Sequence, residues 1–383
     1  MHPTIGKHRA GIADFDFAQS PFVVIWETTR ACDLACRHCR AEAVPYRRPD
    51  ELGTNEAKAM LRKVREFGKC VFVLSGGDCL KRPDVFELVE YGCRLGLRMA
   101  VTPATTPLAT PEAIQNFKNS GISRLAVSLD GSTPAIHDAF RRVDGSFDWG
   151  IRILEECRRI GLSTQVNTVI GRHNIDDFDN LAALMTRVGI VFWEVFFLVP
   201  TGRAKPDDVA SAEEFERIFH KMYELSKIAP FDIKATAAPQ YSRVIMERQV
   251  AERRAGERSE APDSLTGGVM FSLSDGIGRA RNVNDGDGFM FISHIGEIMP
   301  SGFLPIVAGN IRRDNLVQVY RESPVFKQLR DRQLLKGKCG VCEYVKVCGG
   351  SRARAYAVTG DYLEAEPFCA HVPRRFKAGA LAQ

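Results

Sequence analysis

The stretch Cys32-Asp-Leu-Ala-Cys36-Arg-His-Cys39, directly after the apolar run Phe22–Trp26, indicates both the fold and the chemistry of this chain. The apolar run is typical of a buried strand, so the three cysteines are expected in a loop just past that strand. Three thiolates at this spacing can converge on one point, but a cubane iron–sulfur cluster or a structural zinc site takes four ligands. The missing ligand indicates either an open coordination position, where chemistry can occur, or a zinc knuckle with a distant fourth ligand.

The three-cysteine loop resembles the signature of the radical S-adenosylmethionine (SAM) enzymes. In that family three cysteines hold a four-iron four-sulfur cluster, and the fourth iron is left for the amino and carboxylate groups of SAM. The resemblance implies that Cys32, Cys36 and Cys39 are metal ligands and carry catalysis. It also implies the reaction type, in which the reduced cluster cleaves SAM and the resulting 5′-deoxyadenosyl radical abstracts hydrogen from the substrate. This interpretation is favoured over the zinc knuckle.

Length and composition restrict the class of protein. A chain of 383 residues, 45% hydrophobic and 26% charged, is typical of a soluble globular protein of about two domains. The formal net charge of +5 comes without a clustered basic tract, so no nucleic-acid partner is expected. The N-terminus has no signal pattern and no apolar run approaches about 20 residues, which predicts a cytoplasmic protein without a membrane span. Eleven cysteines in such a protein indicate metal or redox chemistry and not disulfides.

After the cysteine loop, predicted strands and helices alternate regularly. The strands are continuously apolar, which is typical of a buried parallel sheet; they are expected at 22–27, 71–74, 98–102, 124–128, 163–169 and 191–198. Helices are expected between them, with N-caps at Thr54, Thr110, Asn174 and Ser211, the last in a capping box with Glu214. Six strand–helix units are too few for an eight-stranded barrel, so we predict an α/β fold of the partial (β/α)6 TIM-like type. This is also the core fold of the family that the cysteines resemble, and its sites gather at the carboxyl ends of the strands.

The predicted barrel occupies residues 21–250, after a polar arm at 1–20. Residues 251–288 are charged and rich in turn formers, which predicts a linker or mobile loop, or alternatively a substrate-covering lid. A strand at 289–293 and a turn at 294–296 then predict a hairpin. This hairpin is expected to open a smaller, cysteine-rich C-terminal domain at 289–383.

The second predicted strand ends in Ser75-Gly76-Gly77-Asp78, which resembles the family motif Gly-Gly-Glu-Pro. That motif contacts the SAM amino group, so the resemblance implies a cofactor-binding role for Gly76, Gly77 and Asp78. This chain has Asp78 and Cys79 where the motif has Glu and Pro, and a backbone role survives that change. The alternative is an ordinary glycine turn.

Three further strand ends resemble SAM contacts of the family. Ser128 ends the fourth predicted strand, and Arg141 matches an arginine that pairs with the SAM carboxylate. Asn167 on the fifth strand, and Leu198 and Val199 after the sixth, resemble positions that hold the ribose and adenine. The alternatives are a solvated surface arginine and ordinary barrel packing.

A second group of cysteines, at Cys339, Cys342, Cys348 and Cys369, offers four thiols and therefore a closed set of ligands. From the spacing alone, zinc and an iron–sulfur cluster are about equally favoured. The surrounding sequence, with Cys348-Gly-Gly-Ser-Arg-Ala-Arg-Ala-Tyr356, resembles the SPASM/twitch extension of radical SAM enzymes. The resemblance implies a second, auxiliary four-iron four-sulfur cluster here, which relays electrons.

Within the radical SAM family, the phrases Pro300-Ser-Gly-Phe-Leu-Pro305 and Cys348–Tyr356 resemble the anaerobic haem-biosynthesis enzymes. Those oxidoreductases modify tetrapyrrole propionates by oxidative decarboxylation or removal of the side chain. We therefore expect a tetrapyrrole substrate and a low-potential electron donor such as ferredoxin or flavodoxin. Arg352 or Arg354 could contact the propionates; the alternative is that these arginines hydrogen-bond beside the auxiliary cluster and balance its charge. A maturase that modifies a ribosomally made peptide and a non-catalytic iron–sulfur electron carrier remain as alternatives.

Overall fold

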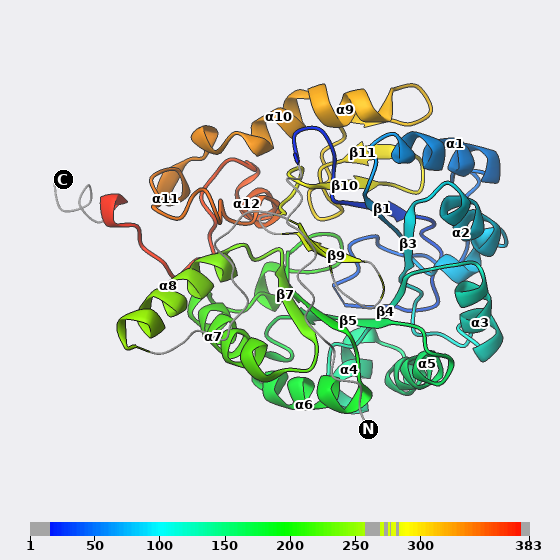
Figure 1. Cartoon of the computed structure of the whole chain (residues 1–383), viewed down its shortest axis with the longest axis horizontal. Coiled ribbons are helices and arrows are strands. Elements are labelled where there is room, and N and C mark those ends of the chain that lie inside the picture. The colour runs from blue at the N-terminus through cyan, green and yellow to red at the C-terminus, as the bar shows by residue number, and fades with distance from the viewer. Residues whose placement is uncertain (1–15, 257–268, 272–274, 276, 281–282, 377–383) are drawn as a thin grey trace.

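Strands from most of the chain contribute to one curved sheet. The computed structural model describes residues 16–256, 269–271, 275, 277–280 and 283–376. Within these residues, ten strands form one sheet in the order β12-β11-β10-β1-β2-β3-β4-β5-β6-β7, and β8 (Val269–Phe271) and β9 (Gly278–Ala280) form a separate pair. The strands lie in an inner ring with helices α1 to α8 outside it (Figure 1).

Strands β1 to β7 pair in parallel, as the continuous apolar runs predicted. They are β1 (Val23–Glu27), β2 (Val71–Ser75), β3 (Arg98–Val101), β4 (Arg124–Ser128), β5 (Thr164–Ile170), β6 (Phe192–Phe197) and β7 (Asp232–Thr236). The predicted partial barrel is confirmed, but β7 was not predicted. Its sequence, Asp-Ile-Lys-Ala-Thr, lacks the continuous apolar character of the other strands because its inward side chains are polar.

Most of the outer helices bury one apolar face, whereas the buried residues of α4 and α8 are largely polar or charged. They are α1 (Thr54–Arg65), α2 (Val85–Arg94), α3 (Pro111–Asn119), α4 (Pro134–Arg141), α5 (Ser146–Ile160), α6 (Phe178–Val188), α7 (Ala212–Ile228) and α8 (Gln240–Arg254). The predicted N-caps Thr110 and Ser211 are confirmed, because their hydroxyls accept the N–H groups of Ala113 and Glu214.

Two other predicted caps differ in the structure: Thr54 is not a cap, and Asn174 is the N-cap residue of a 3-10 turn that leads into α6, without a side-chain capping bond. Gly53 is the N-cap of α1, and its N–H donates to the Glu56 carboxylate at 2.9 Å, so Thr54 is already helical. A single 3-10 turn at 175–177 separates Asn174 from α6. The Asn174 amide instead binds the backbone of Gly171, Asp130 and Val169, which closes the loop after β5.

The predicted hairpin near residue 289 is confirmed, and it joins the barrel sheet directly. Strand β10 (Phe289–Ile292) pairs in parallel with β1, and β11 (Glu297–Met299) and β12 (Gly309–Asn310) follow antiparallel. The sheet therefore crosses the predicted domain boundary, and the division into 21–250 and 289–383 stays a prediction. Beyond it the chain forms α9 (Leu316–Glu322), α10 (Pro324–Arg330), α11 (Gly337–Gly340) and α12 (Arg352–Thr359).

Some predictions concern residues that the structure does not describe. Most of the polar arm, 1–15, and much of the predicted linker or lid, including 257–268, lie outside the described residues. Among the helices that the structure describes, none combines the length and the apolar composition needed to cross a bilayer.

Candidate functional site

The interior of the barrel holds a cavity of about 440 Å³, within the usual range for small-molecule sites. Its lining extends from the cysteine loop at the carboxyl ends of the strands to Arg124 and Phe192 at their amino ends. The walls differ in character. Side chains of β1, β2, β3 and β10 form a mainly apolar wall. Strands β4 to β7 line the cavity with apolar side chains as well, but they also contribute most of its polar ones; these are Arg124, Ser128, Gln165, Asn167, Glu194, Lys234 and Thr236.

The thiols of Cys32, Cys36 and Cys39 all line this cavity, and each sulfur accepts one hydrogen bond. The donors are the Leu34 N–H to Cys32 Sγ at 3.4 Å, Arg141 Nη1 to Cys36 Sγ at 3.6 Å and the Ala43 N–H to Cys39 Sγ at 3.4 Å. Burial raises the pKa of the Cys36 thiol and raises that of Cys32 to about 12. These sulfurs would therefore become thiolates by exchanging protons for metal, as cluster ligands do.

Gly76 and Gly77 hold the start of the cysteine loop in place. A Cβ atom on Gly77 would lie 2.2 Å from the carbonyl oxygen of Ala31, so no larger residue fits there. Gly76 has φ +126°, a conformation that side chains rarely adopt. The Gly77 N–H donates to the carbonyl of Thr29 at 2.8 Å. Both glycines also line the cavity, so their predicted contact with SAM remains a prediction alongside this packing role.

Arg141, predicted to pair with the SAM carboxylate, lines the cavity from the end of α4. The alternative of a solvated surface arginine is wrong, because Arg141 is only 8% exposed. Its Nη2 lies 2.5 Å from Asp130 Oδ2. Burial alone would raise the pKa of Asp130, but Arg141 and two nearby histidines lower it below its usual value. Asp130 was not predicted, although it lies only two residues after the predicted contact Ser128.

The other predicted SAM contacts divide into two groups. Ser128 and Asn167 line the cavity on adjacent strands. Asp78 does not, since its buried carboxylate accepts bonds from Thr106 Oγ1 at 2.8 Å and the Leu80 N–H at 3.1 Å. Leu198 and Val199 are buried in packing contacts outside the cavity lining. Contact of the Asp78 carboxylate, Leu198 or Val199 with SAM therefore has no support in this geometry.

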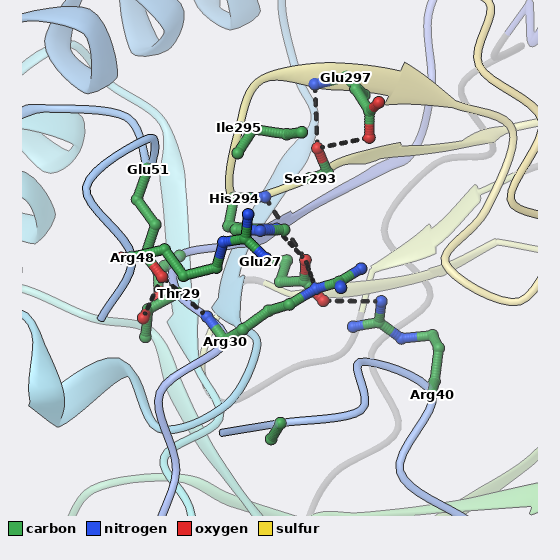
Figure 2. Close-up of polar contacts among 12 residues, drawn as sticks. Glu27, Thr29, Arg30, Arg40, Arg48, Glu51, Ser293, His294, Ile295 and Glu297 are labelled. Atoms are coloured by element: carbon green, nitrogen blue, oxygen red, sulfur yellow. Dashed lines mark hydrogen bonds and ion pairs between the residues drawn. The ribbon is translucent and has the colours of Figure 1, made fainter. Parts of the chain in front are cut away.

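Glu27, at the end of β1, connects the cysteine loop to the β10–β11 turn (Figure 2). Its carboxylate lies 3.0 Å from Arg40 Nη1 and 2.7 Å from His294 Nδ1, with Arg30 Nε at 3.6 Å. Burial alone would raise the pKa of Glu27, but Arg40, His294 and Arg30 together lower it to about 2. The network fixes Arg40, which lines the cavity and stacks on Phe291 with 4.5 Å between its guanidinium carbon and the ring centroid.

We expect Glu27→Gln to destabilise the fold by about 3 kcal/mol at neutral pH, the free energy that the lowered pKa represents. A carboxylate with a lowered pKa stabilises the fold fully above its ordinary pKa of about 4.5, and this stabilisation disappears as the pH falls towards 2. The difference between variant and wild type should therefore shrink below about pH 4.5 in urea unfolding. Glu90→Gln, in an exposed ion pair with Arg94, is the control and should change little. A pH-independent difference for Glu27→Gln would contradict this account.

The four C-terminal cysteines surround a small second cavity. Three of the four sulfurs accept backbone N–H donors, from Glu366 to Cys339 at 3.3 Å, from Tyr344 to Cys342 at 3.4 Å and from Gly350 to Cys348 at 3.4 Å. Among the described residues, neither cysteine set contains three sulfurs that all lie within 4.8 Å of one another. A different trio, Cys342, Glu343 and His371, does meet that distance.

Arg352 and Arg354 do not face the barrel cavity, so their predicted contact with substrate propionates is wrong. Both are fully buried. Arg352 donates to the backbone carbonyls of Tyr362 and Glu364 and to Cys339 Sγ. Arg354 forms an ion pair with Glu366 at 2.8 Å and donates to carbonyls at the ends of β6 and β7. Arginines beside buried loop carbonyls satisfy polar backbone groups. Arg354 thereby joins the C-terminal segment to the barrel, whereas the partners of Arg352 all lie within the C-terminal segment.

Comparison with known proteins agrees with this architecture. The radical SAM superfamily model matches residues 26–185. The chain is 40% identical over 357 residues to the AdoMet-dependent heme synthase of Methanosarcina barkeri, which covers 92% of this chain and 97% of the relative. The chain belongs to the radical SAM superfamily. It is thus an enzyme, and the alternative of a non-catalytic electron carrier is excluded.

Other radical SAM proteins show the same relationship. An AdoMet-dependent heme synthase of Nitratidesulfovibrio vulgaris is 41% identical over 92% of this chain and 93% of its own. The Fe-coproporphyrin III synthase of M. barkeri is 28% identical, and the match covers 91% of this chain and 87% of that protein. The fold resembles that of Streptococcus suis SuiB bound to S-adenosylmethionine, with a TM-score of 0.70, 16% identity, and coverage of 92% of this chain and 78% of SuiB.

The predicted place in the haem-biosynthesis branch of the superfamily is confirmed. Radical SAM enzymes bind SAM and a four-iron four-sulfur cluster, so both cofactors belong to this chain.

Proposed function

We propose that this radical SAM enzyme converts propionate side chains of an iron-bound tetrapyrrole into vinyl groups by oxidative decarboxylation. The observation that carries the proposal is the 40% identity, over nearly the whole of both chains, to a protein named as a heme synthase. The cavity is chemically suited to such a substrate. It offers an apolar wall to a flat macrocycle and cationic side chains to its carboxylates.

The residues at the cysteine end of the cavity fit the SAM-binding cluster. Cys32, Cys36 and Cys39 would hold three irons, since their sulfurs face the cavity and carry one N–H donor each. Arg141, fixed by Asp130, would meet the SAM carboxylate, and Gly76, Gly77, Ser128 and Asn167 would line the rest of that ligand. The cavity walls exclude solvent and orient both reactants, while the cofactors supply the hydrogen-abstracting radical chemistry.

An auxiliary four-iron four-sulfur cluster on Cys339, Cys342, Cys348 and Cys369 is part of the proposal. Ligands of one tetrahedral zinc ion, at Zn–S of about 2.3 Å, would place sulfurs about 3.8 Å apart. No three of the four described sulfurs lie within 4.8 Å of one another, whereas a single zinc ion would require all four to be that close. A cluster fits this set better, because its ligands bind different irons. When bound, this cluster would supply a store for one electron.

The overall chemistry balances with these two cofactors. Loss of one hydrogen atom and one electron from a propionate ion yields a vinyl group and carbon dioxide. A low-potential donor such as ferredoxin or flavodoxin would supply the electron that initiates SAM cleavage.

Anaerobic protein should therefore shift the Soret band of iron-coproporphyrin III. With SAM and reductant, mass spectrometry should show loss of carbon dioxide from that porphyrin together with formation of 5′-deoxyadenosine. A matched reaction without SAM is the control. SAM cleavage with no porphyrin binding and no mass change would overturn the substrate assignment and favour the peptide maturase alternative.

A further inference from the structure

The cavity that we assign to SAM and the substrate has a cationic lining with one weakly paired member. Among the described residues that line it, four are cationic and two are acidic; these are Arg40, Arg124, Arg141 and Lys234, and Glu194 and Asp285. An excess of cations in an enclosed space attracts an anionic ligand. The question is which of the four can form a new ion pair.

The three arginines already have close carboxylate partners. Arg40 lies 3.0 Å from Glu27 (Figure 2), and Arg141 lies 2.5 Å from Asp130. Arg124 holds Asp275 through two contacts, at 2.7 and 3.1 Å. A ligand that recruited one of these guanidinium groups would leave a buried carboxylate without its partner, which is costly.

Lys234 differs from the arginines. Its Nζ lies 3.5 Å from Glu194 Oε1, longer than a typical charge-assisted hydrogen bond. Glu194 does not depend on this contact, because it accepts closer bonds from Thr236 Oγ1 at 2.6 Å and Gln165 Nε2 at 2.7 Å. The Lys234 side chain is 28% exposed, it lines the cavity, and an ammonium group has three donors.

Strand register places Lys234 beside the predicted SAM contacts. Ser128, Asn167, Glu194 and Lys234 are successive partners on β4, β5, β6 and β7, so they form one row across the sheet. Because adjacent strands lie about 4.8 Å apart, Lys234 stands about 10 Å from Asn167 along this row. A ligand carboxylate at Lys234 would therefore lie close to the SAM end of the cavity.

We propose that Lys234 binds a side-chain carboxylate of the substrate. This inference rests on the proposed function, because it assigns the anionic group of that substrate to one residue. Glu194 then positions the ammonium group in the free enzyme and releases it when the carboxylate arrives.

The test compares two ligands, iron-coproporphyrin III and its tetramethyl ester, by anaerobic optical titration of the holoenzyme. Wild type should bind the acid more tightly than the ester. Lys234→Met should weaken acid binding about 10- to 100-fold, as expected for one charge-assisted bond, with little effect on the ester. Lys234→Arg should keep most of the preference for the acid. The matched control is Lys221→Met, which removes the same charge from the outer helix α7, where Lys221 pairs with Asp179 at 2.6 Å.

The outcomes separate this inference from the proposed function. If wild type binds neither porphyrin, the proposed function fails and the inference fails with it. If wild type binds the acid and Lys234→Met keeps the same ratio of acid to ester affinity, only the inference is overturned. Glu194→Gln provides a second variant should Lys234→Met not fold. It removes the competing carboxylate and should tighten acid binding several-fold, and unchanged acid binding would overturn the inference.

Discussion

Replacing Cys32, Cys36 and Cys39 together by alanine should abolish SAM cleavage, whereas Cys348→Ala should leave 5′-deoxyadenosine formation measurable and stop product formation. The reason is that the two cysteine sets lie in separate cavities and would hold separate clusters. Only the first set faces the residues predicted to bind SAM. The measurement is 5′-deoxyadenosine and porphyrin product in the same reaction.

Metal content gives an independent readout of the same variants. Protein purified without oxygen should contain about eight irons, and the triple variant about four. Cys93→Ala is the control, since this half-buried thiol donates to the backbone carbonyl of Gly121 and belongs to neither set. Four irons plus zinc in the wild-type protein would contradict the auxiliary cluster and direct attention to Cys342, Glu343 and His371. Equal loss of SAM cleavage in both variants would contradict the division of roles.

Arg354→Met should lower the free energy of unfolding by about 3–5 kcal/mol, because it leaves a fully buried carboxylate without its partner. It would also remove the donors that satisfy the carbonyls of Phe197, Leu198 and Ala237. The double variant Arg354→Met/Glu366→Gln should lose less free energy of unfolding than the sum of the two single variants. Each single variant leaves one isolated buried charge, whereas the double variant leaves none. Urea unfolding measures each value.

Arg313→Met is the control for this cycle, because Arg313 is largely exposed and should contribute little to stability. Iron content should fall with stability in Arg354→Met, because the N–H of Glu366 donates to Cys339 Sγ. Additive single and double variants would show that Arg354 and Glu366 act independently.

The sequence predicts the barrel well where the physical signal is local. Strands buried on both sides read as continuous apolar runs, so β1 to β6 were located within one or two residues. The cysteine loop was identifiable because three ligands at fixed spacing have few other uses. Strand β7 was missed because its Lys234 and Thr236 face a cavity, and polar inward side chains remove the signal on which the prediction depended.

The parts that were missed depend on contacts between distant residues. Glu27 and His294 are 267 residues apart, and no local pattern shows that a carboxylate at the end of one strand will meet that histidine. Arg352 and Arg354 were assigned to the substrate because arginines bind carboxylates. Their burial follows instead from loop carbonyls that come together only in the folded chain.

The pairing of β10 with β1 has a consequence for how the protein is made. During synthesis β1 emerges first, but the strand that covers its outer edge, and the histidine that holds Glu27, leave the ribosome late. Until then β1 presents an unpaired edge, which is a known route to association with other chains. The Glu27 network, which holds Arg40 next to Cys39, is likewise completed only once this partner strand has docked. A nascent chain that stalls before β10 would therefore keep this edge of β1 open and would lack the histidine that holds Glu27.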